Sequence, residues 1–264
     1  MEPALVVALL WLVFGGLHIG LATAAVRDPI ASRLGPLGFG IFFSLFAAPS
    51  FAALVSYYAT HRSEGLPGLA LGSVALLRWV LVPLVGAGIA LTVAAFDVYP
   101  RSPMALFGPP IRGPRGLERV TRHPFFAGVA LLALAHVLLA TRLVGTVFVA
   151  GLALLAILGA RHQDAKLLRL RGRPYAEYLA ATSAVPFGAL LAGRQRLDWR
   201  ELPLGTLAAG VVLAFVLRSV HEGIFAHSGA WVIGGTLGGA AFATVQAWRR
   251  ARRAELRMPA SQRA

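Results

Sequence analysis

Long apolar runs separated by short basic segments fill most of this chain. Seven such runs can be marked, and each is interpreted as a helix because lipid does not tolerate an unpaired backbone. A bilayer core of ~30 Å needs about 20 helical residues, a length that the fourth to sixth runs only approach. The pattern predicts an all-α fold, a polytopic membrane helix bundle with about seven transmembrane helices. The runs are Ala4 to Ala25, Leu34 to Ala59, Leu69 to Phe96, Pro124 to Ala140, Leu143 to Ala160, Leu202 to Leu217 and Gly229 to Trp248.

Basic residues are concentrated in alternate loops. If the N-terminus lies outside, the cytoplasmic segments hold 21 of the 25 Lys and Arg residues. The outer segments then hold three, Arg62, Arg142 and Arg218. This bias predicts an N-out, C-in orientation, with the C-terminus in the cytoplasm. Residues 1–248 are expected to form one transmembrane domain and residues 249–264 a basic cytoplasmic tail without regular structure.

Composition narrows the class further. The 264 residues are 57% hydrophobic and 14% charged, with a mean hydropathy of +0.70, which is too apolar for a soluble domain. The net charge of +14 is accounted for by the loops, so membrane lipids rather than nucleic acid are the expected partners. The chain has no cysteine, which excludes disulfides, iron–sulfur clusters and covalently attached haem.

Two of the seven histidines, His18 and His136, fall inside apolar runs. An imidazole in lipid needs partners for its ring nitrogens, so each is either hydrogen-bonded between helices or bound to a metal. Two imidazoles poorly match zinc, which takes three or four protein ligands, but they match the two axial positions of haem. At ~1.5 Å per residue, His18 lies about 13 Å from Arg27 and His136 about 21 Å from Arg122. Because the two histidines are thus expected at different depths, helix tilt or side-chain length would have to bring them to one iron.

The Arg122-His123-Pro124 motif opens the fourth run, and two interpretations stand. Proline at the first helical position makes it an ordinary helix start. Alternatively, the cation and the imidazole face an anionic head group, a propionate or a cofactor carboxylate. Glu118 and Glu177 are single carboxylates in basic segments and are expected to pair with neighbouring cations.

The basic segment from Arg161 to Arg200 interleaves leucine and tyrosine with cations, which suits a surface-lying stretch against anionic lipid heads. Gly172 and Pro174 are expected to break it into two pieces. His162 and Asp164, at its start, form either an interfacial polar pair or a solvated helix end.

Two further patterns lie within the runs. Arg78 is an ionisable residue deep in the third run, where it faces a cavity or partner, extends toward the interface, or hydrogen-bonds to a neighbouring helix. Small residues four positions apart, Gly16 with Gly20 and Gly234 with Gly238, predict faces for close helix packing.

Several of these residues occur in a familiar order. The sequence resembles the NnrU family of bacterial membrane proteins and its plastid relatives, the 15-cis-zeta-carotene isomerases, over roughly residues 10 to 225. The order and spacing of the motifs carry the resemblance rather than any one of them. They are Phe14-Gly15-Gly16-Leu17-His18, His61-Arg62, Thr121-Arg122-His123-Pro124, Leu134-Ala135-His136, Thr182-Ser183-Ala184-Val185-Pro186-Phe187 and Gly193-Arg194-Gln195.

The resemblance implies non-covalent haem b with His18 and His136 as axial ligands, and cis–trans isomerisation of an apolar polyene. In the isomerases, iron that has released one ligand on reduction is thought to assist rotation about a 15-cis double bond. The seventh run goes beyond the isomerase pattern. NnrU members are instead associated with denitrification and nitric-oxide metabolism, so a membrane component without catalysis is an alternative.

A second, weaker resemblance is to membrane methyltransferases of the isoprenylcysteine and phospholipid type. It implies S-adenosylmethionine bound near Arg122, His123 and Glu177. The chain departs from that pattern where those enzymes have paired glutamates. The residues that carry this resemblance are Arg122-His123-Pro124-Phe125-Phe126-Ala127-Gly128, Gly172-Arg173-Pro174-Tyr175-Ala176-Glu177-Tyr178 and Val185-Pro186, and His162-Gln163-Asp164 replaces the glutamates.

Overall fold

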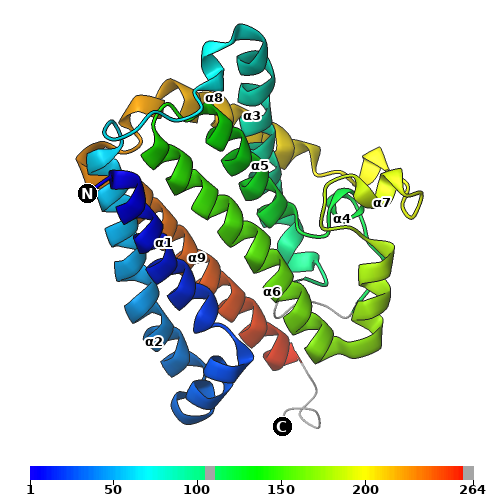
Figure 1. Ribbon diagram of the computed structural model, residues 1–264. Helices are drawn as coiled ribbons and strands as arrows, with labels where there is room; N and C mark the ends of the chain where they lie inside the picture. Colours follow the sequence, from blue (N-terminus) through cyan, green and yellow to red (C-terminus); the bar gives the residue numbers. More distant parts are fainter. Residues whose placement is uncertain (105–110, 258–264) are drawn as a thin grey trace.

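The computed structural model describes residues 1–104 and 111–257, and the named elements of this described part are all helices (Figure 1). Short 3-10 turns occur at η1 (Leu71–Ser73), η2 (Tyr99–Arg101), η3 (Trp199–Glu201) and η4 (His221–Gly223). The helices are α1 (Pro3–Gly20), α2 (Ala24–His61), α3 (Ala75–Val98), α4 (Leu117–Val120), α5 (Pro124–Leu139), α6 (Leu143–Ala181), α7 (Gly188–Leu191), α8 (Leu204–Ser219) and α9 (Ala226–Arg257).

The expected membrane helix bundle is confirmed. Among the described residues, five helices are long and apolar enough to cross a bilayer: α1, α2 from Leu37, α3, α6 and α9. The apolar helices α5 and α8 have 16 residues each, which corresponds to about 24 Å. The count of seven spans and the N-out orientation therefore stay predictions.

The expected start of the third helix and the expected end of the last helix were wrong. The third helix begins at Ala75 rather than Leu69, because residues 62–74 form a loop that hydrogen-bonds to residues 140–143. The last helix continues to Arg257, so the first part of the expected irregular tail is helical. Residues 258–264 of that tail lie outside the described part of the chain.

Helix packing follows the order α9, α2, α1, α6, α5, α3, α8, in which each helix contacts the next. The centre of this row is α6, with α1 on one side and α5 on the other (Figure 1). The Trp11 ring of α1 packs on Gly151, and the Phe126 ring of α5 packs on Gly159. Two glycines of α6 thus admit aromatic rings from opposite sides.

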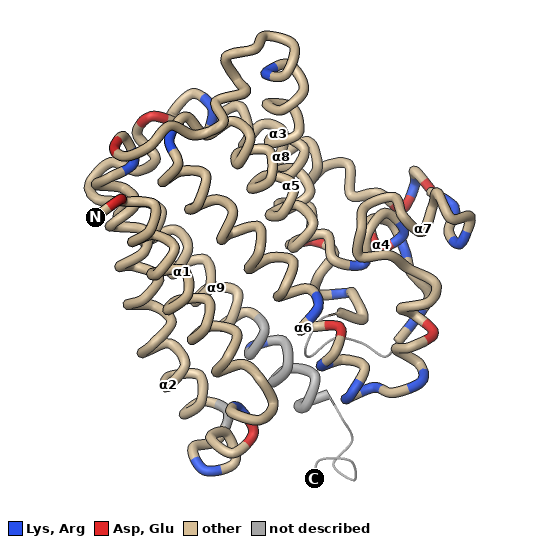
Figure 2. Tube along the Cα trace, in the orientation of Figure 1, with Lys and Arg blue, Asp and Glu red and all other residues tan. Residues whose placement is uncertain are grey.

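The two ends of the bundle differ in charge. At one end, Leu66 joins three segments: its N–H donates to Glu2 at 3.2 Å, and its carbonyl accepts from the N–H of Leu143 at 2.8 Å. At the other end, called the basic end below, the second half of α6 meets the α1–α2 turn and the loops around α4 and α7. Figure 2 shows most Lys and Arg positions around this end of α6 and beside α4 and α7. The positive charge that the sequence concentrates in alternate loops is therefore concentrated at one end of the bundle.

Close helix contacts use glycines other than the expected ones. A Cβ on Gly88 of α3 would lie 2.7 Å from the Gly128 carbonyl of α5, and one on Gly210 of α8 would lie 2.5 Å from the Ala90 Cα. By contrast, a Cβ on Gly16, Gly20, Gly234 or Gly238 would meet nothing within 4 Å. The prediction that those four glycines form packing faces was wrong within this chain.

Candidate functional site

His18 lies in the last turn of α1, among aromatic rings. Its ring centroid is 5.3 Å from that of Phe14 and 5.2 Å from that of Phe43 on α2. Its Nδ1 atom is buried and has no hydrogen-bond partner among the described residues. An unpartnered buried nitrogen is costly, which makes this imidazole a candidate to bind a ligand.

His136 lies in the last turn of α5, near the opposite end of the bundle. Its Nδ1 is 2.9 Å from the Leu132 carbonyl, and a carbonyl only accepts, so Nδ1 carries the proton and Nε2 keeps a free lone pair. That is the tautomer of a metal-ligating histidine whose other nitrogen donates to the backbone. The His136 ring stacks on His221 of η4 at 6.2 Å between centroids and 10° between planes. Sequence reasoning missed His221, because it lies outside the apolar runs and 85 positions from His136.

The two membrane histidines are not brought together, because α6 lies between their helices. α1 and α6 both begin at the end marked by Leu66, whereas α5 runs the other way. Counting from the Trp11–Gly151 and Phe126–Gly159 contacts places His18 near the level of Leu158 and His136 near that of Val149. This difference of nine residues along α6 is about 13 Å. Each imidazole separately suits a ligand, but this arrangement does not fit one haem iron held by both.

Metal ligation by side chains alone finds no support in the described residues, where no three His, Asp or Glu side chains gather.

Arg122 and His123 meet at the basic end on one carboxylate, that of Asp164 from α6. Arg122 donates to Oδ2 from Nη2 at 2.7 Å and from Nε at 3.0 Å, a two-pronged contact. His123 Nε2 lies 2.9 Å from Oδ1, and the Tyr175 hydroxyl donates to the same oxygen at 2.7 Å. His123 and Tyr175 are buried. We call these four residues the Asp164 cluster.

The backbone before α5 is held so that Arg122 and His123 face α6. Pro124 begins α5, and its ring disfavours the helical conformation at His123, whose backbone has φ −118° and ψ 63°. The Arg122 N–H donates to the Ser183 carbonyl at 2.8 Å, and the Thr121 hydroxyl donates to the Ala184 carbonyl at 2.8 Å. The segment that follows α6 therefore fixes the backbone of the Arg122-His123-Pro124 motif beside that helix.

A bend in α6 brings Tyr175 back to Asp164. In a straight helix, eleven residues rise about 16 Å, far beyond the reach of one hydrogen bond. Gly172 has φ 57° and ψ −136°, a conformation that almost only glycine adopts without strain, and the helix changes direction there. The expected break at Gly172 and Pro174 is confirmed, and its effect is to complete the Asp164 cluster.

A second carboxylate, Glu118, is fully buried beside the cluster. Arg112 donates to it at 2.8 and 3.3 Å, and the Arg115 N–H donates at 3.0 Å. As expected, Glu118 and Glu177 each pair with a neighbouring cation, Glu177 with Arg173 at 2.9 Å.

Glu201 ties the loop before α8 to α4. It accepts from Arg119 Nε at 2.9 Å and from the Gly116 N–H at 2.9 Å. The Arg119 hydrogen bond, followed by that of Gly116, lowers the pKa of Glu201 below its usual value.

The Asp164 cluster is saturated with hydrogen bonds, so it suits positioning rather than proton transfer. Three donors occupy the carboxylate, which leaves little capacity to accept a proton from a substrate. Glu177, the third residue expected near S-adenosylmethionine, pairs with Arg173 on the surface, where their side chains are 67% and 90% exposed. The geometry therefore gives the methyltransferase alternative no supporting arrangement.

Two other polar residues are placed differently from expectation. Arg78 lies in the first turn of α3 and is exposed, so it is not deep in a span, and the interpretation as an interfacial residue is the correct one. His162 and Asp164 do not form a pair. Asp164 belongs to the Asp164 cluster, whereas His162 faces a separate cavity with Arg27 and Lys166.

Taken together, the apolar helices and the buried polar end define a polytopic helical membrane protein. The family model described as "NnrU protein" matches residues 6–228, a range that includes both membrane histidines and the whole Asp164 cluster. The chain belongs to the NnrU family.

Two curated relatives are both named 15-cis-zeta-carotene isomerase, chloroplastic. The chain is 27% identical over 238 residues to that of Arabidopsis thaliana, covering 84% of this chain and 62% of the relative. It is 26% identical over 202 residues to that of Zea mays, covering 73% of this chain and 52% of the relative. The chain thus spans between half and two thirds of these relatives' length. No solved structure matches it.

Proposed function

We propose that this protein is an integral membrane isomerase that interconverts cis and trans forms of a conjugated polyene. The observation that carries the proposal is the similarity to two relatives named as carotene isomerases, over a range that contains His18, His136 and the Asp164 cluster. An apolar bundle is consistent with this activity, because a long polyene dissolves in the bilayer and would reach the protein from lipid. The bacterial cytoplasmic membrane remains part of the proposal.

The isomerase assay uses a bacterial host that accumulates a 15-cis polyene. Expression of the full chain should raise the fraction of the trans isomer, measured by chromatography of extracted pigments. His18→Ala and His136→Ala should each lower that conversion. His227→Asn is the control, because His227 lies at the start of α9, outside both α1 and α5, and its left-handed backbone suits asparagine. An isomer ratio equal to that of the empty host would contradict the proposal.

Haem b is a separate part of the proposal, and its role is left to spectroscopy because His18 and His136 do not lie around one site. The visible spectrum of protein purified from haem-replete cells should contain a Soret band. If both histidines bind the iron, His18→Ala and His136→Ala should each shift or abolish that band. If only one histidine binds it, as their separation across α6 favours, only the variant of that histidine should do so. A protein with no Soret band would remove haem from the proposal without removing isomerisation.

A further inference from the structure

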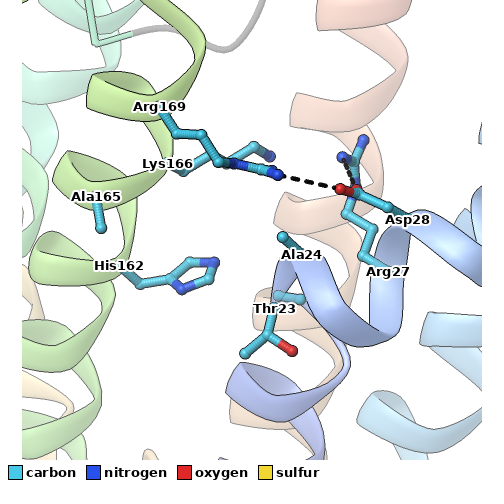
Figure 3. Close-up of a pocket in the computed structure, with 9 residues that line it drawn as sticks. Thr23, Ala24, Arg27, Asp28, His162, Ala165, Lys166 and Arg169 are labelled. Carbon is cyan, nitrogen blue, oxygen red and sulfur yellow. Dashed lines mark hydrogen bonds and ion pairs between the residues drawn. The ribbon is translucent and has the colours of Figure 1, made fainter. Parts of the chain in front are cut away.

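A cavity of about 260 Å³ lies at the basic end, between the α1–α2 turn and α6 (Figure 3). Arg27 and Asp28 enter it from the first turn of α2, and His162, Lys166 and Arg169 enter it from successive turns of α6. The rest of the lining is small: Ala22, Thr23, Ala24 and Ala165. The cavity is therefore open in the middle and cationic around its wall.

Positive charge in this cavity exceeds negative charge. Asp28 is the one carboxylate of its lining, and its contacts with Arg27 at 3.4 Å and Arg169 at 3.3 Å are long for ion pairs. Lys166 is partly buried, and its ammonium has no hydrogen bond or ion pair within the described chain. A partly buried cation without a partner is unfavourable, and a bound anion would neutralise the excess positive charge.

The donors suit a phosphate group. Two guanidinium groups present several N–H donors to a tetrahedral oxyanion, and an ammonium adds a point charge. The N-terminus of α2 also lies at the cavity. The side chain of its cap residue, Thr23, accepts no hydrogen bond from the helix, and its hydroxyl donates to the Gly20 carbonyl at 2.7 Å. The first N–H groups of α2 are thus not capped by that side chain.

Along the bundle axis, the cavity lies where the head-group layer of a bilayer is expected. The apolar part of α6 ends at Ala160, and the cavity residues of α6 begin two positions later. α1 ends at Gly20, and the apolar part of α2 begins at Leu37. The lining thus lies just beyond the hydrocarbon core, where lipid phosphates are found.

We propose that this cavity binds a phosphate group, presented by an anionic phospholipid or as free phosphate, between Arg27, Lys166 and Arg169. The site does not depend on isomerase activity or on haem. Its charge favours phosphatidylglycerol over phosphatidylcholine, whose choline cancels the phosphate charge.

The test measures retention of phosphatidylglycerol and of phosphatidylcholine by the full-length protein in detergent, using native mass spectrometry. Phosphatidylglycerol should be retained preferentially, and Lys166→Ala with Arg169→Ala should weaken that retention roughly tenfold or more. The charge-conserving pair Lys166→Arg with Arg169→Lys should retain the lipid. Arg173→Ala is the matched control, because Arg173 is a cation of the same helix with a 90% exposed side chain outside the cavity.

Added inorganic phosphate distinguishes the two sources. Displacement of the lipid by millimolar phosphate assigns the site to phosphate itself, and retention despite phosphate assigns it to the lipid. Equal retention of the two lipids together with no binding of phosphate would overturn the proposal. So would an equal loss of binding in Arg173→Ala and in the cavity variant.

Discussion

Arg122 donates two hydrogen bonds to a single oxygen of Asp164, from Nη2 at 2.7 Å and from Nε at 3.0 Å, across 42 positions of the chain. This contact joins the start of α5 to the polar half of α6. His123 and Tyr175 form hydrogen bonds with the other oxygen, Oδ1, of the same carboxylate. The Asp164 cluster is therefore also a connection between α5 and the two halves of α6.

Removal of the Arg122 side chain should destabilise the protein. Arg122→Ala leaves the Asp164 carboxylate, which is 16% exposed, without its two-pronged donor, and we expect a loss of about 2–4 kcal/mol. Thermal unfolding in detergent should show a clear fall in Tm. Arg173→Ala, which removes an exposed pair with Glu177, should change Tm little. A similar Tm for the two variants would contradict a stabilising role for the Asp164 cluster.

Substitution of Gly172 tests the bend in α6. Gly172→Ala should cost about 1–3 kcal/mol, because φ 57° with ψ −136° is strained for any residue with a Cβ. Gly234→Ala is a matched control: neither added methyl group meets another atom within 4 Å, but Gly234 has no positive φ. The control should be neutral or stabilising by up to about 1 kcal/mol. Equal unfolding curves for the two variants would show that backbone strain at Gly172 is unimportant.

Close packing of α3 on α5 should be sensitive to side-chain size. Gly128→Leu places a side chain where a Cβ alone would lie 2.7 Å from the Gly88 carbonyl, so the helices must separate. We expect a loss of at least about 2 kcal/mol, measured by thermal unfolding in detergent. Gly238→Leu on α9, which faces open space, should unfold like the unmodified chain.

The contact between Glu201 and Arg119 should depend on pH. Because the pKa of Glu201 is lowered in the folded protein, its stabilising effect is present above the ordinary value of 4.5 and is lost as pH falls through the lowered value. The protection factors of the amides of residues 116 and 199–201, which correct for the intrinsic pH dependence of amide exchange, should therefore be high at pH 6 and should fall as the Glu201 carboxylate becomes protonated at lower pH. Arg119→Ala should lower these protection factors at pH 6. Protection factors in the unmodified chain that do not fall as the carboxylate is protonated would contradict this assignment.

Sequence patterns predicted the helices well and their partners poorly. Apolar length alone located all seven runs, because backbone satisfaction in lipid leaves few alternatives to a helix. Spacing of small residues failed at Gly16 and Gly234, because a packing face exists only where another helix lies opposite it. Pairing of His162 with Asp164 failed for a related reason: residues two apart on a helix point in different directions.

The sequence by itself determined the class of protein, the apolar helices, the concentration of positive charge in alternate loops and the family resemblance, because these depend on local composition and order. Only the tertiary structure decided which side chains meet. It placed α6 between His18 and His136, brought His221 to His136, and used one bend at Gly172 to bring Tyr175 to Asp164. Such contacts depend on the order in which helices pack and on the direction of a few backbone angles, and neither is encoded by the spacing of residues along a single run.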